Sequence, residues 1–124
     1  MFKRALAAVL CVLLCTAAFS AAPDYSRILV NMGYSPSASP IEVTELQIPR
    51  EWGAVYENYN ALQRRGGFDL APYKGRRCVR YTYEIPDLFA RGNILVCEGE
   101  IIGGDVCSIT LDGIMLPLEK DKLK

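Results

Sequence analysis

Few side chains in this sequence are of the types that commonly do chemistry. The chain has no histidine, which removes the commonest general acid–base and the commonest zinc ligand. Its most motif-like segment is Gly103, Gly104 and Asp105. One interpretation is a flexible backbone that presents a single carboxylate to a ligand or substrate. The other, which is the commoner use of such a segment, is a β-bulge in which Asp105 bonds nearby backbone amides.

Basic residues gather in the middle of the chain, where Asp69 is the only acid among Arg64, Arg65, Lys74, Arg76, Arg77 and Arg80. The cluster is either a surface that binds an anionic polymer or lipid headgroups, or a solvated face. We predict that Arg76 and Arg80 are exposed beside Arg64 or Arg65. These four arginines and Asp105 are the candidate ligand contacts.

Three cysteines lie beyond the N-terminal region, namely Cys78, Cys97 and Cys107. An odd number leaves at least one thiol free if a disulfide forms. No CxxC pair is present among them, so a thioredoxin-like redox site is not expected. We favour their use as small hydrophobic side chains on strands, and we expect neither a metal nor a cofactor.

The N-terminus has the pattern of a secretory signal peptide, with Lys3 and Arg4 followed by an uncharged apolar run over residues 5–18. The small residues Ala18 and Ser20 predict cleavage after Ser20, so residues 1–20 would be removed. The alternative is an uncleaved membrane anchor over residues 5–22. Cys11 and Cys15 each follow a leucine, where a lipoprotein signal needs a small residue.

The candidate contacts must be positioned by the elements around them. The sequence predicts a short helix over residues 24–32, capped by Asp24 and ended by Gly33. A strand over residues 41–48 follows, with a possible bulge near Glu45. Pro49 then opens a longer helix, which ends at Gly66 and Gly67. Its predicted apolar face, which we expect to pack on the sheet, consists of Trp52, Val55, Tyr56, Tyr59 and Leu62.

The second half of the chain predicts strands. Apolar and polar residues alternate over residues 76–85, which is typical of a half-buried antiparallel strand. Apolar runs at 93–97 and 100–102, joined by Glu98 and Gly99, predict a hairpin. Gly103 and Gly104 then allow a bulge or a close approach of another segment.

These elements predict an α+β fold in the order α-β-α-β-β-β. We expect a small antiparallel sheet of three to four strands with both helices packed on one face. The domain organisation would be a signal peptide at 1–20, a single domain at 24–117 and a solvated tail at 118–124.

Several segments resemble a known family, above all residues 55–63, 67–75 and 101–105. The stretch from 41 to 116 is similar to exported proteins of clostridia-like Gram-positive bacteria that are classed as a domain of unknown function. The resemblance implies export and a single domain, and it implies no activity, substrate or cofactor.

Two classes of function fit the sequence. The first is a non-catalytic exported or cell-envelope module that binds a protein or an anionic polymer. The alternative is a small hydrolase that uses a carboxylate or a thiol, for which Asp105 or Cys107 would need a polar pocket and a shifted pKa. The formal net charge of zero argues against a nucleic-acid partner, which favours a strongly basic protein.

Overall fold

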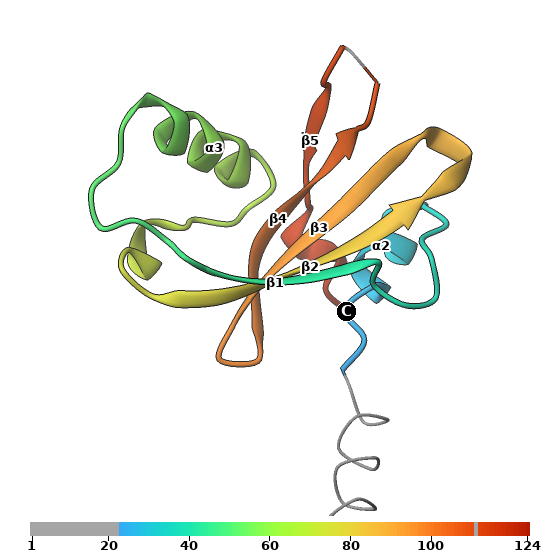
Figure 1. Ribbon diagram of the computed structural model, residues 1–124, viewed down its shortest axis with the longest axis horizontal. Helices are drawn as coiled ribbons and strands as arrows, with labels where there is room; N and C mark the ends of the chain where they lie inside the picture. Colours follow the sequence, from blue (N-terminus) through green and yellow to red (C-terminus); the bar gives the residue numbers. More distant parts are fainter. Residues whose placement is uncertain (1–22, 111) are drawn as a thin grey trace, which may run out of the picture.

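The computed structural model describes residues 23–110 and 112–124. Their central feature is an antiparallel sheet of five strands in the order β1-β2-β3-β4-β5 (Figure 1). The strands are β1 (Glu42–Gln47), β2 (Arg77–Ile85), β3 (Ala90–Cys97), β4 (Glu100–Ser108) and β5 (Met115–Pro117). The helices are α2 (Arg27–Asn31) and α3 (Ala54–Arg65), and short 3-10 turns cover Ala71–Tyr73, Pro86–Leu88 and Lys120–Lys122. The predicted signal peptide lies outside the described residues, and among these residues no helix has the length and apolar character to cross a membrane.

The predicted α+β class is confirmed, but the sheet has one strand more than the predicted three to four. The additional strand is β5, which pairs with β4 from Asp105 opposite Pro117 to Cys107 opposite Met115. It is three residues long and lies at the edge of the sheet. Pro117 is tolerated there because an edge strand has neighbours on one side only.

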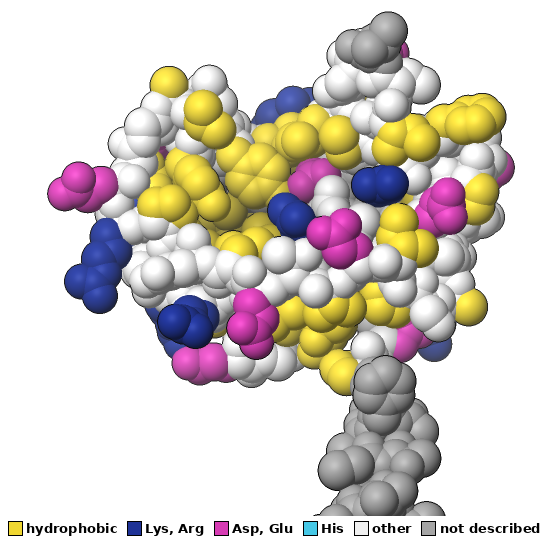
Figure 2. All heavy atoms as spheres, viewed as in Figure 1, with side chains coloured by type: hydrophobic (Ala, Val, Ile, Leu, Met, Phe, Trp, Pro, Cys, Tyr) yellow, Lys and Arg dark blue, Asp and Glu magenta, His cyan; other side chains and the backbone are white. Residues whose placement is uncertain are grey.

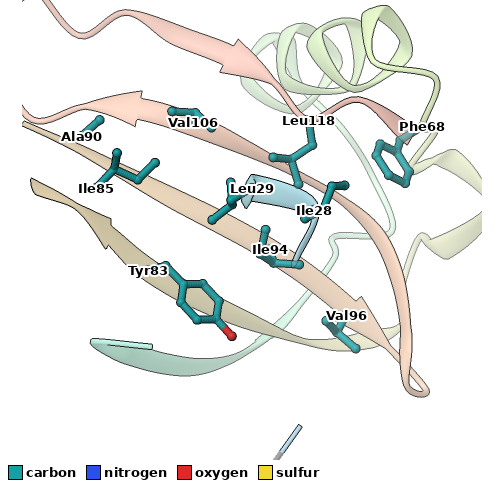
Figure 3. Close-up of a cluster of buried hydrophobic side chains, with 10 residues drawn as sticks. All are labelled: Ile28, Leu29, Phe68, Tyr83, Ile85, Ala90, Ile94, Val96, Val106 and Leu118. Atoms are coloured by element: carbon teal, nitrogen blue, oxygen red, sulfur yellow. The ribbon is translucent and has the colours of Figure 1, made fainter. Parts of the chain in front are cut away.

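The two helices cover opposite faces of the sheet, so the prediction of both helices on one face is wrong. Ile28 and Leu29 of α2 pack in one cluster with Ile94 of β3 (Figure 3). The neighbouring Leu95 belongs to a second cluster, beside Tyr56 of α3. Since successive strand residues point to opposite faces, α2 and α3 lie on opposite sides. Residues 94–97 of β3 are all buried, and such a continuous apolar run needs cover on both faces.

Three predicted boundaries move for local reasons. Asp24 accepts a hydrogen bond from the Ser26 N–H at 2.9 Å, so α2 begins after Ser26 rather than at Asp24. The longer helix begins at Ala54, after Gly53, and not at Pro49. Strand β1 pairs with β2 in continuous register from Glu42 to Gln47, which means that the bulge near Glu45 is absent.

The predicted hairpin and bulge are confirmed. Glu98 and Gly99 both have positive φ, at 51° and 79°, as the tight turn of a two-residue hairpin requires. Leu95 pairs with Gly103 and Val96 with Ile101. The bulge is therefore at Ile102, one residue before the glycine pair.

The C-terminal segment is attached to the domain rather than being a solvated tail from residue 118 onward. The Leu118 side chain is fully buried in the cluster beneath α2. The Lys120 N–H donates to the Gly66 carbonyl at 2.8 Å, and the Asn31 amide donates to the Lys122 carbonyl at 2.9 Å. The Lys120 side chain remains exposed.

Candidate binding pocket

Helix α3 is joined to the sheet by the side chain of Gln63. This side chain is fully buried, donates to the Gly104 carbonyl at 2.9 Å and accepts from the Gly104 N–H at 2.8 Å. The amide thus satisfies both backbone groups of one residue next to the bulge, where the ladder is interrupted. It holds the last turn of α3 against β4.

The glycine pair is what permits this close approach. A Cβ atom at Gly103 would lie 2.5 Å from Oε1 of Gln63, and one at Gly104 would lie 2.0 Å from the Asn93 carbonyl oxygen. Gly104 also has φ at +149°, which side-chain-bearing residues rarely adopt. The segment 103–105 is therefore the docking point of a helix, and it places Asp105 beneath α3.

Asp105 is only 4% exposed and is held by two side chains rather than by backbone amides. The Tyr59 hydroxyl of α3 donates to Oδ2 at 2.6 Å, and the Asn93 amide of β3 donates to Oδ1 at 3.0 Å. Asn93 in turn accepts from the Thr82 hydroxyl at 2.8 Å. A polar row therefore crosses three central strands under the helix.

Burial governs the electrostatics of this row. It raises the pKa of Asp105 above its ordinary value, against the opposing effects of the hydrogen bonds from Tyr59 and Asn93 and of the charge of Arg80. Burial, followed by the nearby Asp105 charge, also raises the pKa of Tyr59 strongly. Tyr59 consequently remains a protonated donor at neutral pH.

A cavity of about 310 Å³ opens beside this row, between α3 and the sheet. Its volume lies at the lower end of the range of about 300–1,000 Å³ for ligand sites. In the space-filling view, hydrophobic side chains gather between α3 and the strands, with acidic and basic side chains beside them (Figure 2). We name this cavity the α3 pocket, and it is lined by Leu46, Ile48, Val55, Tyr56, Tyr59, Leu70, Arg80, Asn93, Leu95, Asp105, Cys107 and Met115.

Arg80 is the only basic residue of that lining. It lies on β2, opposite Leu95 of β3, and its side chain is 39% exposed. Its closest acid is Glu42, with an Nη2-to-Oε1 distance of 3.9 Å, which is too long for a hydrogen bond. The Arg80 Nε atom is buried without a partner in the described part of the chain. The pocket thus combines apolar walls with a guanidinium whose hydrogen-bonding capacity is largely unused.

The structure distributes the predicted contact residues over three places. Arg80 and Asp105 meet in the α3 pocket. Arg64 and Arg65 line a separate hollow at the end of α3, and Arg64 lies 3.8 Å from Asp69. Arg76 pairs with Glu98 at the hairpin turn. The sequence cluster of arginines therefore becomes a set of separate cations, most of them facing an acid.

The predicted apolar face of the longer helix packs on the sheet at three of its five positions, namely Trp52, Tyr56 and Tyr59. Leu62 is half-buried and belongs to neither cluster. Trp52 and Tyr56 stack with ring centroids 5.8 Å apart, and Tyr59 packs in the same cluster. Val55 is 81% exposed and lies at the pocket rim.

Sequence reasoning missed the residues that hold Asp105 and α3 in place. Nothing in the sequence indicated that the Tyr59 hydroxyl bonds Asp105. Gln63 follows Tyr59 by four positions and so shares its helix face. That spacing was the available signal for its role. Within residues 23–110 and 112–124, no three histidine, cysteine, aspartate or glutamate side chains gather as metal ligands would.

Comparison with known proteins gives one match. A family model described as a domain of unknown function, DUF4830, matches residues 28–106. This range includes α2 from Ile28, the whole of α3 and of strands β1 to β3, and β4 up to Val106. The expectation of a domain of unknown function is thereby confirmed. No curated protein and no solved structure matched the chain.

Proposed function

The chain belongs to the DUF4830 family, a domain of unknown function, and we propose that it is an exported, non-catalytic module that binds a protein segment in the α3 pocket. The observation that carries this proposal is the guanidinium of Arg80, which makes no hydrogen bond within the described residues, beside apolar walls. A protein segment offers the complement, namely an apolar side chain next to a carboxylate. Arginine pairs with carboxylates through two parallel hydrogen bonds, which fixes the orientation of the bound group.

The walls suggest how the segment lies. Leu46 of β1 and Ile48, which directly follows that strand, lie at one edge of the sheet. Tyr56 comes from α3, and Met115 from the other edge at β5. Met115 is 40% exposed. Apolar contacts from three elements would surround an inserted side chain, and the acidic group would remain at the mouth near Arg80.

An anionic polymer has less support as the partner. Such a partner needs several unpaired cations along one surface. Arg64, Arg76 and Arg80 instead lie in three separate places, at the end of α3, at the hairpin turn and in the α3 pocket. Only Arg80 of these three lies in the apolar pocket.

A hydrolase also has less support. Burial raises the pKa of the Cys107 thiol, so little thiolate is present at neutral pH. Both Asp105 oxygens already accept hydrogen bonds. Asp105 is better placed to orient Tyr59 and Asn93 than to attack a substrate.

Selection from a library of displayed random peptides tests the proposal. The full chain is immobilised, and bound peptides are expected to share an apolar residue close to an acidic one. Val55→Glu places a carboxylate at the pocket rim and should weaken binding at least about tenfold, because it repels the acidic group. Ala61→Glu is the matched control, since Ala61 is exposed on the same helix and outside the pocket.

Arg80→Gln distinguishes the contribution of the guanidinium from that of the apolar walls. It should remove the preference for an acidic residue while the preference for an apolar residue persists. Equal effects of Val55→Glu and Ala61→Glu, or selected peptides without a shared apolar residue, would contradict protein binding at this pocket.

A further inference from the structure

Two of the three cysteines in the described part lie next to one another in the core. Cys78 of β2 is 3% exposed and Cys97 of β3 is 4% exposed. Both belong to the cluster that includes Ile48 and Leu70 on the α3 face of the sheet. Both thiols are free in the structure, and the Cys97 thiol donates to the Arg77 carbonyl at 3.6 Å.

The register places the two cysteines directly opposite each other. Pairing between β2 and β3 runs to Val79 opposite Val96, and one further step brings Cys78 opposite Cys97. This agrees with their shared cluster, because directly opposite residues point to the same face.

The backbone hydrogen bonds show whether Cys78 and Cys97 form a hydrogen-bonded or a non-hydrogen-bonded pair of the antiparallel ladder. Ile48 donates its N–H to the Arg76 carbonyl at 2.9 Å, so the backbone of Arg76 points toward β1. Every second residue of a strand directs its backbone N–H and C=O groups to the same neighbouring strand. The backbone groups of Cys78 are therefore also directed toward β1. Cys78 and Cys97 are then a non-hydrogen-bonded pair, in which Cα atoms lie about 4.5 Å apart and side chains approach closely.

That spacing falls within the Cα range of disulfides, about 4.4–6.8 Å. We propose that Cys78 and Cys97 form a disulfide across β2 and β3 when the chain folds in an oxidising compartment. The bond would link strands β2 and β3 covalently on the α3 face of the sheet. The inference is independent of what the pocket binds.

The odd thiol is then assigned to Cys107. Cys107 lies opposite Arg91 of β3, six positions along that strand from Cys97. At about 3.3 Å per residue, the separation is about 20 Å. Cys107 therefore reaches neither partner without unfolding of the sheet.

Oxidation proceeds by thiol–disulfide exchange with a disulfide such as oxidised glutathione. One protein thiol loses its proton, and its sulfur attacks the glutathione disulfide and releases one glutathione thiolate. The second protein thiolate attacks the mixed disulfide and releases the other. Two protein thiols are thus oxidised, and one glutathione disulfide is reduced to two glutathione molecules.

In the folded protein the thiols of Cys78 and Cys97 are poor nucleophiles, and this determines at which stage of folding the disulfide forms. Burial, reinforced by the neighbouring thiol of Cys97, raises the pKa of Cys78 to about 11. Thiolate is therefore scarce at neutral pH in the folded protein. The bond should form during folding, before the cluster that includes Ile48 and Leu70 packs around the pair.

Disulfide mapping tests the inference on the full chain. The chain is reduced, unfolded, and refolded in a mixture of oxidised and reduced glutathione, and free thiols are then alkylated. Trypsin releases Cys78 on a short peptide, and a protease that cleaves after Glu98 separates Cys97 from Cys107. We expect loss of two of the three free thiols of the described part, all of it as the Cys78–Cys97 link.

The same oxidation in concentrated urea is the control. The unfolded chain should favour the shorter loop between Cys97 and Cys107 over that between Cys78 and Cys97 by about two- to threefold, from loop-closure entropy alone. Cys107→Ser should leave the native link unchanged. Cys78, Cys97 and Cys107 all recovered in alkylated form after refolding, a link to Cys107, or the same distribution in urea and in native buffer would overturn the inference.

Discussion

Replacement of Tyr59 by phenylalanine removes the shortest hydrogen bond to Asp105 and leaves the packing of the ring in place. The Tyr59 hydroxyl donates to the carboxylate at 2.6 Å, and Asp105 is 4% exposed, so water does not readily replace the lost donor. A hydrogen bond to a charged group contributes about 1.5–3 kcal/mol. We therefore expect Tyr59→Phe to lower the free energy of unfolding by about 2 kcal/mol at neutral pH. This corresponds to a fall of about 10 °C in Tm for a domain of this size.

The same substitution should cost less in acid. Burial raises the pKa of Asp105 above 3.8 in the folded protein, so the folded state binds more protons than the unfolded state between 3.8 and that raised value. The stability that Asp105 contributes therefore falls as pH rises from 3.8 through its raised pKa, and it is fully present below pH 3.8. Loss of the Tyr59 donor disfavours the charged form of Asp105 further. The free energy of unfolding of Tyr59→Phe should therefore fall more steeply with rising pH than that of the parent chain. Below pH 3.8 the carboxyl is neutral, and the expected cost drops to about 1 kcal/mol.

Urea unfolding at about pH 7 and about pH 3.5 measures both quantities. Tyr56→Phe is the matched control, because Tyr56 lies on the same helix and no hydrogen bond of its hydroxyl is found within the described residues. It should change stability by less than about 0.5 kcal/mol. An equal cost of Tyr59→Phe at both pH values, or a cost no larger than that of Tyr56→Phe, would refute a buried Asp105 carboxylate held by Tyr59.

Three further outcomes are expected. Gly103→Ala should destabilise the domain by about 1–3 kcal/mol, because its Cβ would meet Oε1 of Gln63 at 2.5 Å; urea unfolding of the single variants and of the double variant with Gln63→Ala should show that the two costs are not additive. The oxidised cysteine pair should raise the free energy of unfolding by about 3 kcal/mol over the reduced pair, measured by the same method with and without reductant. Mass spectrometry of the exported protein should give Ala21 as the first residue, whereas a full-length membrane-embedded product would favour an anchor.

Local patterns in the sequence were sufficient for most of the strands. The alternation over residues 76–85 predicts β2, which runs from Arg77 to Ile85, because it has the period of a half-buried strand. Glu98 and Gly99 predict the turn between β3 and β4, since Gly99 adopts the positive φ that the turn needs. Both features act within a few residues, so they can be read without knowledge of the tertiary structure.

Longer-range relations were not visible in this way. Tyr59 and Asp105 are 46 residues apart in the chain, and nothing in either segment specifies that they meet. The opposite placement of α2 and α3 depends on which of the adjacent residues Ile94 and Leu95 each helix covers. An apolar run is equally compatible with burial of either face or of both. The arginine cluster was misleading for the related reason that neighbours in sequence are separated once β2 and α3 diverge.

The glycine pair shows how a correct local prediction can leave its purpose open. Gly103 and Gly104 predicted a bulge or a close approach, and both are present. The approaching group is the side chain of Gln63, which the sequence does not identify. The segment therefore appears motif-like because of how a helix docks, and Asp105 is buried as a consequence.

Backbone amide chemical shifts during titration with a selected peptide test the central claim most directly. The account predicts that the largest changes occur at pocket-lining residues, namely Leu46, Ile48, Val55, Tyr56, Tyr59 and Arg80. Val55→Glu should abolish these changes, while Ala61→Glu should preserve them. Changes concentrated instead around Arg64, Arg65 and Lys120, at the separate hollow beyond the end of α3, would contradict the assignment of the α3 pocket as the binding site.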